Sequence, residues 1–209
     1  MAKLLISPLS TYERNGWYCP ELVWFIFSAG QSQKHKISFA PVHNFIPAGG
    51  GRNVACKKFL ETDNEWILMV DNDMVPPFNL LEMLDKATPD MDILIPLFHL
   101  WENDTSTVKV VWAPVANPDQ MSVEELNATE WLELQSAGTG CIFIHRRVFE
   151  KLPYPWFGYE YDKDGCMSAT EDVPFLQTAR KHGFRVWGNT RYTVGHFRSV
   201  DLSKIQKYK

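Results

Sequence analysis

The feature that most constrains the fold is an uninterrupted apolar run, Trp66 to Val70, followed directly by Asp71, Asn72 and Asp73. Such a run is typical of a strand that is buried on both faces, as in parallel sheets covered by helices. Open α/β sheets bind their ligands beyond the carboxyl ends of their strands. The run therefore predicts a buried parallel sheet with two carboxylates at its binding edge.

Strand and helix patterns alternate through the first half of the chain, whereas the second half is less regular. We expect helices over residues 18–30, 49–62, 80–84 and 170–183. We expect strands over residues 3–9, 37–42, 66–70, 92–98, 108–112, 131–135, 141–145, 184–187 and 192–196. Alternation of this kind predicts the α/β class with a largely parallel sheet.

The length of 209 residues suits a single domain, which we expect to span residues 1–209. A net charge of -4 argues against a protein that coats nucleic acid through general positive charge. No apolar stretch approaches the roughly 20 residues that a membrane-spanning helix needs, and no signal peptide is recognisable. The four cysteines lack the spacing of a zinc or redox site. We therefore expect a cytoplasmic protein.

Asp71 and Asp73 are two residues apart, so in an extended segment both carboxylates point to the same side. Hard oxygen ligands of this kind suit Mg²⁺ or Mn²⁺. His196, at the end of a late strand, could complete the site with Asp73, and a nitrogen ligand would favour Mn²⁺. The alternatives are a solvated acidic turn and a histidine with a purely structural role.

Glu171 and Asp172 open the expected helix 170–183, after a loop that contains glycine. A carboxylate held on a helix end beside such a loop suits a general base that faces an acceptor. The alternative is simpler, since acidic residues are common at helix starts because of the helix dipole.

Two glycine-rich segments could approach a ligand closely. Residues 49–53 (Gly-Gly-Gly-Arg-Asn) could place backbone N–H groups and the Arg52 guanidinium beside a diphosphate, or could form an ordinary turn. Neither the Walker A pattern nor the dinucleotide-binding fingerprint is present there. Gly138-Thr139-Gly140 allows close approach of a ligand, or forms a bulge between strands. The aromatic residues Trp156 and Phe157 could stack on an acceptor, or pack within their own loop.

Taken together, these segments resemble the GT-A glycosyltransferases, notably family-2-like and phage-encoded members. The resemblance runs through most of the chain and is carried by residues 51–53, 66–73, 138–140, 170–175, 179–184 and 194–196. It implies a three-layer α/β/α sandwich with a mixed, mostly parallel sheet. It also implies transfer of a hexose from a nucleoside-diphosphate-sugar to an acceptor hydroxyl, with a divalent cation, Mn²⁺ or Mg²⁺.

The resemblance further implies a role for each candidate residue. Asp71, Asp73 and His196 would bind the metal, Asp172 would deprotonate the acceptor of an inverting enzyme, and Glu171 would support it. Trp156 and Phe157 would contact the acceptor. The implied donor-binding set is Pro8, Arg52, Asn53, Asp71, Asn72, Gly138, Thr139 and Gly140.

Some features of the resemblance stay open. The first strand ends in Ser7-Pro8-Leu9, without the acidic residue that often reads the nucleobase, so UDP- and GDP-sugars both remain candidates. The acceptor classes left open are a saccharide, a small polar molecule, a protein and a modified DNA base. A nucleotidyltransferase is the nearest rival, but only Arg14 and Gly16 follow the first strand where a triphosphate-binding loop is needed. A non-catalytic carbohydrate- or nucleotide-binding module is the remaining alternative.

Overall fold

The computed structural model describes residues 1–10, 18–43, 47–102, 107–110, 112–115 and 130–197. Its core is a curled sheet in which neighbouring strands follow the order β2–β1–β3–β9–β5–β12–β8–β7. In this order only β8 and β9 run against the other strands. These strands are β1 (Lys3–Leu9), β2 (Lys36–Phe39), β3 (Trp66–Asp71), β5 (Ile93–Glu102), β7 (Trp112–Pro114), β8 (Trp131–Ala137), β9 (Cys141–His145) and β12 (Val186–His196).

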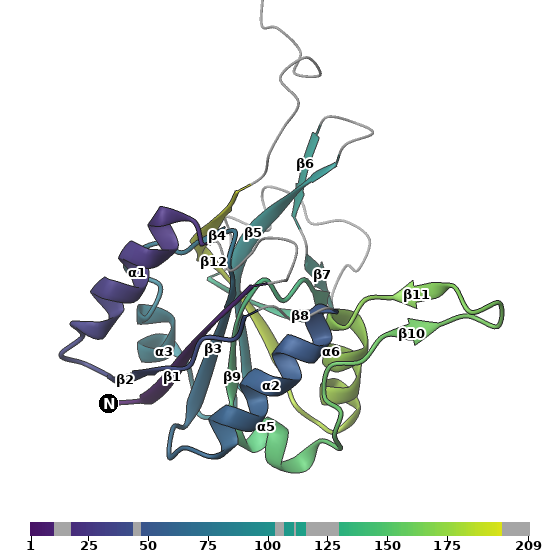
Figure 1. Cartoon of the computed structure of the whole chain (residues 1–209), viewed down its shortest axis with the longest axis horizontal. Helices are drawn as coiled ribbons and strands as arrows, with labels where there is room; N and C mark the ends of the chain where they lie inside the picture. The colour runs from purple at the N-terminus through teal and green to yellow at the C-terminus, as the bar shows by residue number, and fades with distance from the viewer. Residues whose placement is uncertain (11–17, 44–46, 103–106, 111, 116–129, 198–209) are drawn as a thin grey trace, which may run out of the picture.

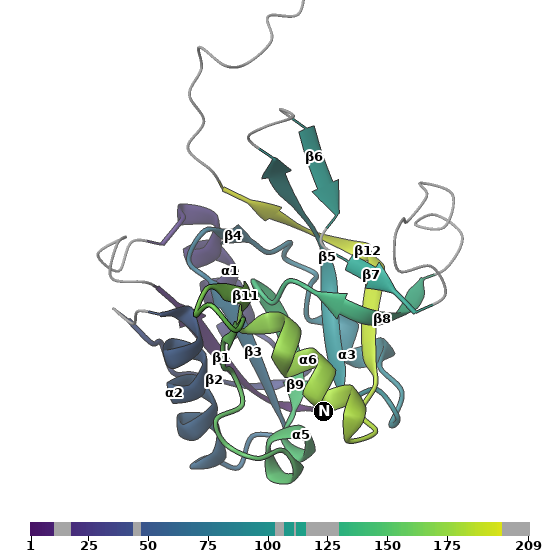
Figure 2. The ribbon, with the colours of Figure 1, turned by 90° about the vertical axis from the view of Figure 1, so that its right-hand side faces the viewer.

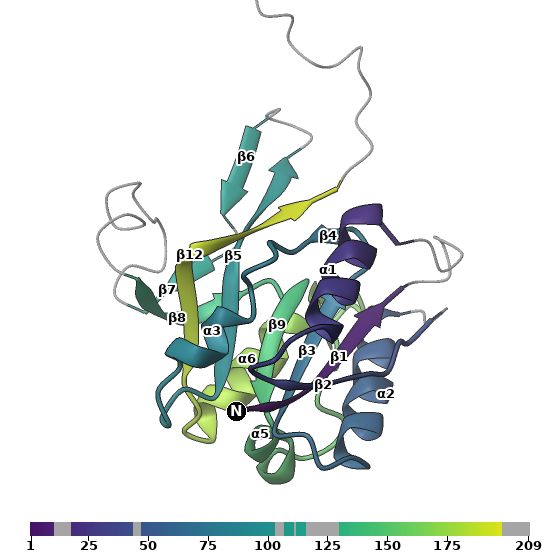
Figure 3. The ribbon, with the colours of Figure 1, turned by 90° about the vertical axis from the view of Figure 1, so that its left-hand side faces the viewer.

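Helices cover both faces of this sheet, which confirms the α/β class and the three layers. One face carries α1 and α3 (Figure 3), and the other carries α2, α5 and α6 (Figure 2). Short strands β4 (Met74–Val75) and β6 (Thr107–Val110) extend β12 and β5 respectively. The helices are α1 (Pro20–Gly30), α2 (Ala48–Leu60), α3 (Glu82–Lys86), α5 (Arg146–Lys151) and α6 (Asp172–Lys181). No described helix is long and apolar enough to cross a membrane.

Strand β3 lies between β1 and β9 and is buried as its apolar sequence predicts. Ile67, Leu68, Met69 and Val70 are fully buried. Burial on both faces explains why the strand has no polar residue before Asp71, which is the first residue to reach the sheet edge. The prediction from this run is confirmed.

Helix α2 begins at Ala48, one residue before the expected helix 49–62, and the three glycines lie in its first turn. Gly49 is needed there because the helix end packs closely on another segment. A Cβ at Gly49 would lie 3.1 Å from the Tyr159 ring and 3.2 Å from Cβ of Glu171. The glycines therefore bring the start of α2 against the start of α6.

The two strands expected over 184–187 and 192–196 are one strand, β12. Its pairing with β5 shifts register between Asn189 and Thr193, and its last residues pair with β4. The irregularity between those two residues breaks the sequence pattern without ending the strand, because backbone hydrogen bonds to different partners continue on each side. As a result, β12 carries His196 to the far edge of the sheet.

Besides the short strand β4, two features of the fold were not expected from the sequence. One is the short helix α5, directly after β9. The other is a two-stranded hairpin of β10 (Glu160–Tyr161) and β11 (Met167–Ala169), which was expected to be a loop. The hairpin extends away from the body of the molecule (Figure 1).

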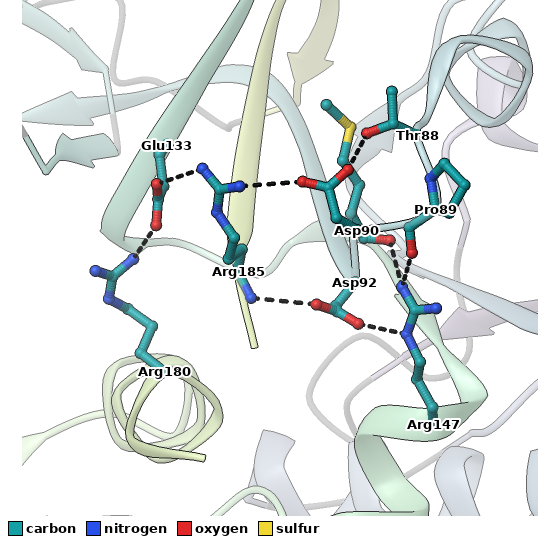
Figure 4. Close-up of polar contacts among 9 residues, drawn as sticks. Thr88, Pro89, Asp90, Asp92, Glu133, Arg147, Arg180 and Arg185 are labelled. Atoms are coloured by element: carbon teal, nitrogen blue, oxygen red, sulfur yellow. Dashed lines mark hydrogen bonds and ion pairs between the residues drawn. The ribbon is translucent and has the colours of Figure 1, made fainter. Parts of the chain in front are cut away.

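An ion-pair network joins elements at the edge where β5 and β12 begin (Figure 4). Arg147 of α5 donates to Asp92, and Arg185 pairs with both Asp90 and Glu133. Arg180 of α6 also pairs with Glu133. We call these three arginines and three carboxylates the amino-edge network; it ties α5, α6, β8 and the first residues of β5 and β12 together.

Candidate active site

The opposite edge of the sheet gathers most of the predicted site residues. Asp71 ends β3, and Asp73 follows it in the turn before β4. Because β4 pairs with the end of β12, with His196 opposite Met74, the histidine reaches Asp73. The backbone N–H of Phe197 also donates to the carbonyl oxygen of Asp73, at 2.7 Å. Tertiary pairing thus brings together two residues that are 123 positions apart.

The surroundings of the His196 ring are unusual because both ring nitrogens face acceptors. Nδ1 lies 3.1 Å from the carbonyl oxygen of His99, and Nε2 lies 3.2 Å from Oδ2 of Asp73. A neutral imidazole carries one proton and can satisfy only one of these contacts. With Nδ1–H donating to the carbonyl, Nε2 requires either a second proton or a cation between it and the carboxylate.

Arg52 links the end of β3 to the start of α6. Its side chain is 4% exposed; Nη2 donates to Oδ2 of Asp71 at 3.0 Å and Nε donates to Oε1 of Glu171 at 3.2 Å. Its third nitrogen, Nη1, is buried and has no hydrogen-bond partner among the described residues. The chain Glu171–Arg52–Asp71, which is buried at Arg52 and Glu171 but 32% exposed at the Asp71 side chain, therefore connects the two predicted acidic sites.

The charges at this edge are unbalanced. Burial raises the pKa of Asp71 to about 6, and the negative charges of Asp73 and Glu171 add to this effect, although Arg52 opposes it. Burial and the nearby Glu171 carboxylate also raise the pKa of Tyr159, whose hydroxyl accepts a hydrogen bond from the Gly49 N–H. Three carboxylates thus share one guanidinium and one imidazole, which leaves an excess of negative charge.

A bound cation would neutralise this excess of negative charge. The residues present provide some, but not all, of the predicted cation ligands. Asp73 and His196 are adjacent, but Asp71 is turned toward Arg52. Within the ranges that the structure describes, no three His, Cys, Asp or Glu side chains form a metal-binding group. The predicted set of three protein ligands is therefore not assembled. Asp73 and His196 alone would leave positions for ligand oxygens and water, and their mixed oxygen and nitrogen atoms suit Mn²⁺ more than Mg²⁺.

The segment 138–140 lies directly beside Asp71. The carbonyl oxygen of Gly140 accepts a hydrogen bond from the Asp71 N–H at 2.8 Å. A Cβ at Gly140 would lie 2.1 Å from Cε of Met74 and 3.4 Å from Oδ2 of Asp71. The buried Thr139 hydroxyl has no hydrogen-bond partner among the described residues. This predicted segment therefore adds a second unsatisfied polar group near the carboxylate.

Asp172 is the first residue of α6 and is partly exposed. Its Oδ1 accepts hydrogen bonds from the Thr170 hydroxyl, at 2.6 Å, and from the Val173 N–H, at 3.1 Å. The Thr170 hydroxyl therefore orients this carboxylate. Glu171, its neighbour, is buried and points to Arg52. The two residues thus occupy different surroundings, as the 100° between successive helical positions requires.

Three residues that were predicted to contact a ligand instead have side chains that contact other parts of the protein. The Asn53 side chain hydrogen-bonds only to loop backbone: its amide donates to the Phe157 carbonyl, and its oxygen accepts from the N–H groups of Trp156 and Phe157. Phe157 is 2% exposed and stacks on Phe175 at 4.2 Å between ring centroids. The expectation that Phe157 contacts an acceptor is therefore corrected, because its ring is in the core. Trp156 is half-buried, and its indole N–H donates to Leu152.

Pro8 and Asn72, both predicted to contact the donor, are buried near the same edge. Sequence reasoning missed their neighbours Tyr18 and His43. The Tyr18 hydroxyl lies 2.7 Å from Nδ1 of His43, just beyond the end of β1. The contact of the Tyr159 hydroxyl with the start of α2 was not predicted either. The sequence does show aromatic residues with hydrogen-bonding groups next to the strand ends. Their contacts could not be predicted, because their partners lie far away in the sequence.

Comparison by sequence finds no matching family model and no matching curated protein. Comparison by structure does find similar folds. A crystal structure of A197 from STIV has a TM-score of 0.65 and 18% identity, and the match covers 95% of this chain and 87% of that one.

Two further solved structures are glycosyltransferases. GalNAc-T7 with UDP, GalNAc and Mn²⁺ has a TM-score of 0.56 and 10% identity; the match covers 96% of this chain but 44% of that one. S. aureus TarS 1-349 in complex with UDP-GlcNAc has a TM-score of 0.50 and 13% identity, with 100% and 62% of the two chains covered. At these identities the likeness shows the fold alone: the chain has the mixed α/β fold of the GT-A glycosyltransferases.

Proposed function

We propose that this chain is a metal-dependent glycosyltransferase that moves a sugar from a UDP- or GDP-sugar to an acceptor hydroxyl. The observation that carries the proposal is the pair of acceptors around the His196 ring. A ligating histidine commonly donates its other ring N–H to a backbone carbonyl, as His196 Nδ1 is placed to do toward His99. Asp73 and His196 would then hold a divalent cation between them, and Mn²⁺ suits the mixed oxygen and nitrogen ligands.

The donor half of the proposal rests on Arg52, Thr139 and the cation. When bound, the cation would neutralise the charge that develops on the leaving diphosphate. Arg52 is held rigidly by Asp71 and Glu171, so its guanidinium would be a fixed positive charge beside the donor diphosphate. Fixed charges of this kind stabilise a transition state because they need no reorganisation during the reaction.

The acceptor half of the proposal rests on Asp172. Its carboxylate is oriented by Thr170 and Val173 at the start of a helix, and would accept the proton from the acceptor hydroxyl. The acceptor oxygen then bonds to the anomeric carbon while the bond to the diphosphate oxygen breaks. Attack opposite the leaving group inverts the anomeric configuration. Glu171 acts indirectly, by fixing Arg52.

The test is hydrolysis of UDP- and GDP-sugars by the whole chain with Mn²⁺ and without acceptor. We expect turnover that EDTA abolishes and Mn²⁺ restores. Mn²⁺ binding, followed by calorimetry, should be lost in Asp73→Asn and in His196→Asn. His35→Asn is a matched control, because His35 and Asp85 form another histidine–aspartate pair, 3.4 Å apart, between the ends of β2 and α3. Full turnover with EDTA, or unchanged Mn²⁺ affinity in His196→Asn, would contradict the proposal.

A further inference from the structure

The β10–β11 hairpin projects from the body of the molecule (Figure 1). All residues from Glu160 to Ser168 are exposed. An isolated two-stranded hairpin is at best marginally stable in water. Yet this one presents two large apolar side chains, Tyr161 at 63% and Met167 at 55% exposed, which pair directly across the strands. An uncovered apolar pair on such an element indicates a surface that a partner covers.

The root of the hairpin is joined to the candidate active site at both ends. Strand β11 ends at Ala169, three residues before Asp172. Strand β10 begins next to Tyr159, whose hydroxyl is anchored to the backbone of Gly49 in α2. A segment bound at the root of the hairpin therefore lies near the carboxylate that we propose to deprotonate the acceptor.

The charge of the hairpin restricts what can bind there. Glu160, Asp162 and Asp164 carry negative charge, and Lys163 is the single positive residue in the stretch 160–169. A polyphosphate chain would be repelled, whereas lysine and arginine side chains would be attracted. The hairpin also forms a sheet of two strands, so the described part of the chain leaves both outer edges unpaired. Unpaired edges offer backbone hydrogen bonds that an extended polypeptide can satisfy by adding a strand.

We infer that the β10–β11 hairpin binds the acceptor and that the acceptor is an extended, neutral-to-cationic polypeptide segment bearing a hydroxyl side chain. This inference rests on the proposed function, because it assigns the substrate class of the same site. Tyr161 and Met167 supply apolar contact, the acidic residues select basic side chains, and the strand edge aligns the segment. Asp172 is then next to the bound hydroxyl.

The experiment uses the whole chain and four probes: serine- and threonine-containing decapeptides in a lysine-rich and a glutamate-rich set, a single-stranded DNA oligonucleotide and a soluble oligosaccharide. Binding is followed by fluorescence anisotropy and sugar transfer by radiolabelled donor. We expect the lysine-rich peptides to bind at least tenfold more tightly than the other probes, less so at high salt, and to be the set that accepts sugar. Equal or tighter binding of DNA or oligosaccharide would overturn the inference.

Variants identify the surface. The double variant Glu160→Lys, Asp164→Lys should weaken binding of lysine-rich peptides about tenfold, and Tyr161→Ala should weaken it by a similar factor. Lys163→Glu should strengthen it about two- to fivefold. Asp63→Lys is the remote control, since Asp63 is an equally exposed acid paired with Lys3, and it should change nothing. Asp162 is left unchanged because its carboxylate accepts hydrogen bonds from two backbone N–H groups of the hairpin turn.

Hydrolysis of the donor without acceptor separates the two proposals. It should be unchanged in every hairpin variant. In the unmodified chain, normal donor hydrolysis without selective binding of the lysine-rich peptides would overturn the acceptor assignment alone. Absence of donor hydrolysis in the unmodified chain would overturn the proposed function, whereas peptide binding that depends on the hairpin charges would still support the docking surface.

Discussion

The two edges of the sheet each hold a cluster of arginines and carboxylates, but the clusters differ in balance and burial. The amino-edge network (Figure 4) has three arginines for three carboxylates, and its Arg185 and Asp90 side chains are 43% and 58% exposed. At the carboxyl edge, Arg52 alone serves Asp71 and Glu171, its side chain is 4% exposed, and Asp73 stands nearby.

This difference separates charges that join elements of the fold from the charges to which we assign the cation and the donor. Exposed ion pairs with equal numbers of positive and negative groups require little desolvation, and they contribute little to the free energy of unfolding. A buried cluster with excess negative charge is costly, and its cost falls when a cation or other ligand binds. The unsatisfied Arg52 Nη1 and Thr139 Oγ1 occur at the carboxyl edge as well. The predictions below test this contrast, from the largest expected effect to the smallest.

Changing one carboxylate at each edge should give the largest contrast. Asp172→Asn keeps the shape but removes the proton acceptor, so turnover should fall roughly 10²–10⁴-fold while donor affinity stays nearly intact. Asp90→Asn in the amino-edge network should leave turnover within about twofold. Steady-state kinetics and donor calorimetry provide the measurements. Near-normal turnover in Asp172→Asn, with an inactive Glu171→Gln, would exchange the roles assigned to these two residues.

Removing one arginine from each cluster compares their effects on stability. Arg52→Met leaves buried carboxylates without their counter-charge, so the free energy of unfolding should fall by about 3–5 kcal/mol. Arg185→Met removes partly exposed pairs and a contact with the Trp187 ring, and should cost about 1 kcal/mol. Urea denaturation measures both. Equal losses would show that burial does not distinguish the two clusters.

The stability of the chain should depend on pH because burial disfavours the ionised form of Asp71. Its pKa is about 6 in the folded chain, against 3.8 for the free group, so the folded state holds the proton more tightly. The contribution of this carboxyl group to the free energy of unfolding is therefore fully present below pH 4, and it is lost as the pH rises from 4 to 6. Relative to Asp71→Asn, the unmodified chain should lose on the order of 1 kcal/mol over this range. Denaturation in EDTA tests this; a constant difference between the two proteins would refute it.

The smallest effect should come from the buried Thr139 hydroxyl. Thr139→Val keeps the shape and removes an unsatisfied polar group, so the free energy of unfolding should stay constant or rise by up to about 1 kcal/mol. Donor affinity should fall about two- to tenfold, the usual effect of losing one neutral hydrogen bond. Thr193→Val, on an exposed position of β12, is the control. Unchanged donor affinity would place the hydroxyl away from the donor.

Local sequence patterns predicted the fold class because the periodicity of apolar residues reports burial directly. The buried run of β3, the close approach at Gly140 and the helix end at Gly183, with φ of 84°, were all visible in the sequence. The pattern failed at β12, where a change of partner strands interrupts the periodicity, and at the hairpin, whose exposed residues carry no apolar alternation.

By itself, the sequence determined which chemical groups end which strand: carboxylates after β3, an acidic pair before α6 and a histidine closing β12. Only the tertiary structure decided which of them meet. Arg52 was expected beside a diphosphate, yet it spans Asp71 and Glu171; Asn53 was expected beside a donor, yet it holds the 156–157 loop. The reason is physical. A buried side chain takes the nearest complementary partner in space, and strand pairing and helix packing decide which residue that is.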